Sequence, residues 1–137
     1  MELTATATLA DDKMKFRCTA GTHALETDYT PPYGTGDGPT SLELFLASLC
    51  SCLGGSLAVL LRHGGKRLTG IAVSAAGTRR ETHPTCFEHI EMQVRVQSPD
   101  LSQADVDHAV QLSEERICPV AAMIKGNVSV HITATLS

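Results

Sequence analysis

Aromatic residues are scarce in this chain of 137 residues, which limits what the protein can bind. They make up 4% of the sequence, and tryptophan is absent. Because stacking on bases or sugars depends on aromatic rings, a stacking platform for nucleic acid or carbohydrate is not expected. The net charge of −4 and the lack of any Lys/Arg-rich run also argue against nucleic-acid binding.

Cysteine and histidine show no regular spacing either. The chain has five cysteines, an odd number with no CxxC pair, and six histidines with no HExxH pattern. Residues 1–10 lack the features of a signal peptide, so a reducing, cytoplasmic setting is expected. A zinc site built from Cys50, Cys52, Cys118 and a histidine is disfavoured, because zinc ligands usually pair across short loop gaps. The sequence gives no reason to expect a metal or another cofactor.

The chain does contain enough apolar residues for a hydrophobic core. Hydrophobic residues make up 42% and charged residues 19% of the sequence, a balance typical of globular proteins. At this length, a single domain covering residues 1–137 is the expectation.

Hydrophobic periodicity predicts both strands and helices. Apolar and polar residues alternate through most of residues 1–30, over 68–75 and 90–96, and from 128 to 136, as in half-buried strands. Capping signatures at Thr40 and Ser102 open two helices, and a third, short helix covers residues 120–125. The expected order is three strands, a helix, two strands, two helices and a strand. This order indicates an α+β fold with antiparallel pairing.

The first predicted helix, residues 40–62, is the longest apolar segment. Thr40 and Glu43 form a capping box at its start, and Gly64 and Gly65 mark its end. Its run of about 20 mostly apolar residues at 42–61 is long enough for a membrane span. Flanks without an aromatic belt or a basic bias favour a buried central helix, so no membrane is expected. One small subunit cannot cover such a helix, and the sequence therefore predicts a homodimer.

Two cysteines in different surroundings could carry redox chemistry. Cys52 lies in the apolar helix, and Cys118 directly precedes Pro119, which predicts a helix cap whose free amides favour a thiolate. Cys50 and Cys52 point about 200° apart on a helix, so only one of them can face Cys118, and the spacing does not tell which. The competing interpretation is that these thiols only fill the core.

One run of residues is more specific than the rest. The segment GPTSLELFLASLCSC at residues 38–52, followed much later by Cys118, Pro119 and Val120, resembles the OsmC/Ohr family of osmotically induced and organic hydroperoxide resistance proteins, in particular its OsmC-like branch. The resemblance extends over nearly the whole chain. It implies an OsmC-like fold with antiparallel sheets around a long central helix, in an intertwined homodimer.

The resemblance also implies roles for individual residues. Cys52 matches the peroxidatic cysteine and Cys118 the resolving cysteine, whereas Cys50 falls at a position that is often small in the family. Leu42 stands where the best-understood branch has a glutamate that helps to activate the thiol, and the arginine partner of that glutamate is missing too. Arg17 is the nearest substitute, although alternation along its strand places it equally well on a solvated face.

Two functions of different classes follow. One is a thiol-dependent peroxidase for organic hydroperoxides, in which Cys52 becomes a sulfenic acid, Cys118 closes a disulfide and an external dithiol restores both. In that case a cation must approach Cys52, and Arg17 is the expected one. The other is a non-catalytic dimer that binds a small apolar or thiol-reactive molecule, with both cysteines as packing residues.

Overall fold

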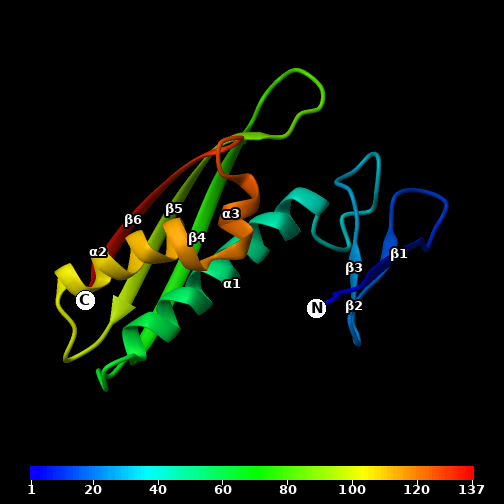
Figure 1. Ribbon diagram of the computed structural model, residues 1–137. Helices are drawn as coiled ribbons and strands as arrows, with labels where there is room; N and C mark the ends of the chain where they lie inside the picture. Colours follow the sequence, from blue (N-terminus) through cyan, green and yellow to red (C-terminus); the bar gives the residue numbers. More distant parts are fainter. The chain divides into compact units, whose positions relative to one another are not determined.

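The computed structural model describes residues 1–137, and its main elements follow the expected order (Figure 1). They are β1 (Ala5–Leu9), β2 (Phe16–Ala20), β3 (His23–Thr27), α1 (Ser41–Arg62), β4 (Gly70–Arg79), β5 (Phe87–Gln97), α2 (Gln103–Leu112), the π-helix η1 (Ser113–Ile117), α3 (Pro119–Ile124) and β6 (Ser129–Leu136). The chain forms two compact units, Met1–Phe45 and Leu46–Ser137. That residues 1–137 form a single domain stays a prediction.

The first unit contains a three-stranded antiparallel sheet in the order β1-β2-β3. Gly21 lies in the tight turn between β2 and β3 with a φ of 60°, which residues with a Cβ rarely adopt. Cys18 on β2 is partly buried, and its sulfur lies 4.0 Å from the Thr27 hydroxyl on β3. The short turns and the alternation along the strands account for this sheet.

A buried carboxylate organises the loop between β3 and α1. Asp28, which is 1% exposed, accepts hydrogen bonds from the backbone amides of Tyr29, Thr35 and Asp37. The Thr35 hydroxyl donates to the same carboxylate at 2.7 Å. Gly34 packs so closely that an added Cβ would collide with the Asp28 carboxylate. These contacts hold the loop in one conformation.

The second unit contains a sheet in the order β4-β5-β6, with both antiparallel and parallel strand pairing. β4 and β5 are antiparallel, whereas β5 and β6 are parallel, with Glu91 opposite His131. The prediction of purely antiparallel pairing is therefore wrong for this pair. The connection between β5 and β6 contains the helical segments α2, η1 and α3. This long connection allows β6 to run parallel to β5, whereas a short hairpin would make the two strands antiparallel.

Alternation along β5 gives this sheet one buried face and one polar face. Ile90, Met92, Val94 and Val96 are buried, and the charged and amide residues between them are exposed. Figure 1 shows the helical segments of the unit on one side of the sheet. The core of the unit lies between that side and the helices.

Helix α1 begins and ends where the sequence predicts. The Thr40 hydroxyl accepts from the Glu43 amide at 3.2 Å, and the Glu43 carboxylate accepts from the Thr40 amide at 2.9 Å. Gly64 and Gly65 follow its end with φ values of 88° and 82°. By length and composition alone, α1 could cross a membrane, and 28% of its most apolar stretch is buried within the chain. Much of its apolar surface therefore remains uncovered within the chain.

Helix α2 starts with the predicted capping box but does not continue as one helix. The Ser102 hydroxyl accepts from the Asp105 amide at 3.1 Å, and the Asp105 carboxylate accepts from the Ser102 amide at 2.9 Å. After Leu112 the helix widens into η1, and α3 starts at Pro119. The break at Pro119 was predictable from the sequence, whereas the π-helix was not.

Candidate active site

Cys52 lies in the middle of α1, at the edge of the buried face of the helix. Leu49, Leu53 and Leu57 on that face are almost fully buried, whereas Cys52 is partly exposed. The Cys52 carbonyl also accepts a hydrogen bond from the Ser56 hydroxyl at 2.9 Å. The helix thus fixes the backbone of Cys52 and leaves the residue partly open to a reactant.

Cys118 is positioned by two consecutive helical segments. Its amide donates to the Ser113 carbonyl at 2.8 Å, five residues back, which closes the π-helix. With Pro119 at the first position of α3, Cys118 is the N-cap, and its sulfur accepts from the Ala121 amide at 3.5 Å. Cys118 is 1% exposed. Single π-turns are frequent at functional sites, and this one places the thiol.

The sulfur atoms of the two cysteines meet although 66 residues separate them in the chain. The Cys118 thiol donates a hydrogen bond to the Cys52 sulfur, with an Sγ–Sγ distance of 2.9 Å. Since a disulfide bond measures about 2.05 Å, the pair needs only a small further approach to form one. Cys52, and not Cys50, is therefore the helix cysteine that faces Cys118, as the family resemblance implied and the spacing alone had left open.

Burial dominates the protonation of Cys118. Removal from water raises the pKa of its thiol, and the hydrogen bond to Cys52 raises it further, against a smaller opposing effect of the Ala121 amide. The expectation that the helix cap makes Cys118 a favoured thiolate is therefore wrong, because desolvation outweighs the cap. Burial also raises the pKa of the Cys50 thiol.

Arg17 lies on β2 in the first unit. It is opposite Glu26 of β3, its guanidinium lies 3.8 Å from the Glu26 carboxylate, and its side chain is 69% exposed. This is the solvated arrangement that alternation along β2 also allowed. The role of Arg17 in activating Cys52 stays a prediction.

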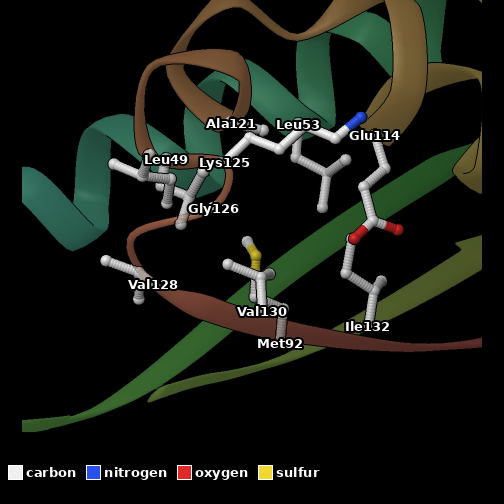
Figure 2. A pocket seen from close by; sticks show the side chains of 11 residues that line it. Leu49, Leu53, Met92, Glu114, Ala121, Lys125, Gly126, Val128, Val130 and Ile132 are labelled. Atoms are coloured by element: carbon white, nitrogen blue, oxygen red, sulfur yellow. The ribbon is translucent and has the colours of Figure 1, made fainter. Parts of the chain in front are cut away.

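An apolar pocket of about 90 Å³ lies between α1, α3 and the sheet of the second unit (Figure 2). Its lining residues are Leu49, Leu53, Met92, Glu114, Ala121, Ile124, Lys125, Gly126, Val128, Val130 and Ile132. Leu53 follows Cys52 in α1, and Ala121 supplies the amide that binds Cys118. The pocket and the cysteine pair therefore share elements α1 and α3.

Sequence reasoning missed some contributors to this arrangement. The Ala121 amide was within reach of prediction, since an N-cap side chain accepts from an amide two or three residues on. Nothing in the sequence signals the π-helix that starts at Ser113, whose hydroxyl is buried without a hydrogen-bond partner. No pattern in the sequence indicated that Glu114 would line a pocket either.

No three histidine, cysteine, aspartate or glutamate side chains converge as a metal site.

An α+β fold that brings a thiol on a long helix against a second thiol at a helix cap defines a protein with a dithiol site. The chain matches the family model described as "OsmC-like protein" over residues 34–133, which is most of its length. It belongs to the OsmC/Ohr family.

Individual relatives agree with this assignment. Protein YhfA of Escherichia coli K12 is 32% identical over 97 residues, covering 70% of this chain and 72% of YhfA. The structure of an OsmC-like protein from Mycoplasma pneumoniae matches with a TM-score of 0.87 at 17% sequence identity. The match covers 99% of this chain and 97% of the Mycoplasma chain. The organic hydroperoxide resistance protein OsmC from Legionella pneumophila has a TM-score of 0.75 at 17% identity, with coverages of 98% and 97%. The structural matches confirm the predicted OsmC-like α+β fold.

Proposed function

We propose that this chain is a thiol-dependent peroxidase that reduces organic hydroperoxides, with Cys52 as the peroxidatic cysteine and Cys118 as the resolving cysteine. The observation that carries the proposal is the 2.9 Å distance between the two sulfur atoms. The chemistry requires no metal, flavin or haem, because the two thiols supply both electrons.

The proposed reaction has three steps. The Cys52 thiolate attacks the terminal oxygen of the hydroperoxide, the O–O bond breaks, the alkoxide takes up a proton and leaves as an alcohol, and Cys52 becomes a sulfenic acid. Cys118 then loses its proton and attacks the Cys52 sulfur, so that the S–O bond breaks, water leaves and a disulfide forms. An external dithiol restores both thiols by exchange and is itself oxidised to a disulfide.

The hydrogen bond between the sulfur atoms supports this division of roles. The Cys118 thiol donates and the Cys52 sulfur accepts, so the two cysteines are not equivalent. The raised pKa of Cys118 keeps its proton in place until Cys52 has been oxidised. Cys118 is also buried, whereas Cys52 is partly exposed, and a peroxide therefore reaches Cys52 first.

The comparison with relatives and the apolar pocket support the substrate class. The Legionella protein, which shares the fold of this chain, is named an organic hydroperoxide resistance protein. An apolar pocket beside the cysteines favours an organic over an inorganic peroxide. The proposal includes an antioxidant role under stress in the reducing cytoplasm, where thiols are kept available.

The proposal also includes a homodimer. Val59 on α1 is 70% exposed, and only 28% of the most apolar stretch of this helix is buried within the chain. A second copy of the chain would cover this surface symmetrically. A lipid bilayer is the competing partner for α1, and a dimer that stays soluble without detergent excludes it.

Counting free thiols tests the peroxidase. One equivalent of tert-butyl hydroperoxide per chain should remove two of the five thiols in the wild type, because one disulfide forms. The control Cys50→Ser should also lose two thiols, whereas Cys52→Ser should lose none. An unchanged count in the wild type contradicts the peroxidase and favours the alternative, a non-catalytic dimer that binds a small apolar or thiol-reactive molecule.

A separate measurement tests the proposed cation. If Arg17 of either subunit stabilises the Cys52 thiolate, Arg17→Met should slow peroxide-dependent thiol loss. Glu26→Gln is the matched control, because it removes the ion-pair partner and keeps the guanidinium group. An equal rate of thiol loss in Arg17→Met and the wild type would contradict the proposed role of Arg17 in activating Cys52. Arg17 would then be only a solvent-exposed residue of β2.

A further inference from the structure

Two opposite charges lie at the apolar pocket beside the cysteines without pairing with each other. Glu114 belongs to η1 and Lys125 follows the last residue of α3, and both line the pocket. The ion pairs of the chain, with N···O distances up to 4.0 Å, involve neither of them. In Figure 2 the Glu114 carboxylate is directed toward Ile132, whereas the Lys125 side chain ends away from that residue. Both charges are therefore available to a ligand.

The remaining lining of the pocket is apolar. Leu49 and Leu53 of α1 face Met92 of β5 and Val130 and Ile132 of β6 across it. A protein cavity of about 150 Å³ can hold benzene, so the volume of about 90 Å³ here fits a smaller group of three or four carbon atoms. A long acyl chain is too large for this space.

The two charges restrict the polar end of the ligand. A simple carboxylate would be attracted by Lys125 but repelled by Glu114, and a simple amine would be attracted by Glu114 but repelled by Lys125. A zwitterion avoids both penalties, because its ammonium group can lie against Glu114 and its carboxylate against Lys125. Valine and leucine combine such an end with a branched side chain of three or four carbon atoms.

We propose that this pocket binds a free aliphatic α-amino acid. The side chain enters the apolar space under α1 and α3, the ammonium group contacts Glu114 and the carboxylate contacts Lys125. This is the pocket that also favours an organic peroxide in the proposed function, but neither cysteine lines it, so binding of the amino acid does not require the peroxidase chemistry. Because Leu53 and Ala121 belong to its wall, the ligand would pack against the immediate neighbours of the cysteine pair.

Titration with L-leucine, followed by the methyl NMR signals of Val128, Val130 and Ile132, tests the proposal in the full-length wild-type protein. Saturable shifts with a dissociation constant on the order of 1 mM are expected for so small a ligand. 4-Methylpentanoate lacks the ammonium group, isoamylamine lacks the carboxylate, and glycine lacks the side chain. Each should bind at least about threefold more weakly than leucine, since one favourable contact is lost in each case.

Variants locate the binding site. Glu114→Gln and Lys125→Met should each weaken leucine binding about threefold to fivefold, as expected for losing one exposed charge contact. Glu115→Gln is the matched control, because Glu115 is next in the chain and does not line the pocket. Val130→Phe should abolish the shifts by filling the space.

Four results would overturn the proposal. The first is the absence of any shift at tens of millimolar leucine. The second is binding of 4-methylpentanoate or isoamylamine as tight as that of leucine. The third is leucine binding that Glu114→Gln and Lys125→Met leave unchanged. The fourth is conversion of the protein to a folded monomer by Val130→Phe, which would assign the pocket to the contact between two copies of the chain.

Discussion

The thiol of Cys118 donates a hydrogen bond to the sulfur of Cys52 across 2.9 Å. The donor is the buried cysteine and the acceptor the partly exposed one. Burial raises the pKa of the Cys118 thiol, so this cysteine tends to keep its proton. The pair is therefore asymmetric before any oxidant arrives.

Replacing the donor should slow the reaction of its partner. In Cys118→Ala the Cys52 sulfur loses its hydrogen bond, and alkylation of Cys52 by iodoacetamide at neutral pH should slow about tenfold. Cys118→Ser keeps a hydroxyl donor and should retain most of the rate. Mass spectrometry of the Cys52 peptide measures both. Equal rates in the alanine variant and the wild type would show that the hydrogen bond does not activate Cys52.

Truncation of the buried face of α1 should cost stability. Leu53 is almost fully buried, so Leu53→Ala should lower the free energy of unfolding by about 2–5 kcal/mol, through lost burial and the cavity that remains. Leu53→Met conserves volume and should cost less than about 1.5 kcal/mol. Urea denaturation measures the difference. Similar losses in the two variants would contradict a tightly packed site for Leu53.

Protonation of Asp28 should weaken the first unit in acid. The Thr35 hydroxyl, followed by backbone amides, lowers the pKa of Asp28 to about 2 from an ordinary value of 3.8. The resulting stabilisation is present above about pH 4 and disappears as the pH falls toward about 2. Asp28→Asn removes this dependence and should flatten the stability profile across that window.

Asp12→Asn is the matched control for this experiment, because Asp12 is exposed and not part of the Asp28 cluster. Its unfolding profile between pH 2 and 4 should match that of the wild type. Urea midpoints at a series of pH values give the comparison. The same acid sensitivity in Asp28→Asn and the wild type would assign the acid dependence to other carboxylates.

The N-cap of α1 should contribute modestly to stability. Thr40→Ala removes the hydroxyl that accepts from the Glu43 amide and should lower the free energy of unfolding by about 1 kcal/mol. Thr40→Ser keeps the acceptor and should leave stability nearly unchanged. Thermal unfolding followed by circular dichroism checks both. A loss in the serine variant as large as in the alanine variant would point to the lost methyl group instead of the cap.

The exposed side of α1 should carry the contact between subunits. Val59→Lys places a charge on that side, and light scattering should then report the 14.5 kDa chain at micromolar concentration instead of a dimer. Thr133→Lys, on the polar face of the second sheet, should remain a dimer. A wild-type protein that is itself monomeric would contradict the dimer.

Local structure was largely predictable from local sequence. The capping boxes at Thr40 and Ser102 and the glycine pair after α1 involve residues within a few positions of one another, so their patterns report their geometry directly. The N-cap position of Cys118 followed from Pro119 for the same reason. Strand boundaries were less certain; β4, for example, extends to Arg79, beyond its predicted end.

Features that depend on contacts between distant segments were not predictable. The parallel pairing of β5 and β6 requires a crossover whose direction is decided by packing on the sheet. The π-helix before Cys118 adds a residue to one turn, and no pattern in its five residues signals this. Glu114 enters the pocket lining through that same turn.

The sequence by itself determined that this chain has an apolar helix carrying Cys52 and a capped helix start carrying Cys118, in an order of elements typical of the OsmC/Ohr family. The spacing left open whether Cys50 or Cys52 faces Cys118, the family resemblance implied Cys52, and the tertiary structure shows Cys52 there. Only the tertiary structure decided that burial outweighs the helix cap in setting the protonation of Cys118. The reason is physical. Helices, strands and caps depend on nearby residues, whereas the approach and the desolvation of two thiols depend on how α1 and α3 pack against one sheet.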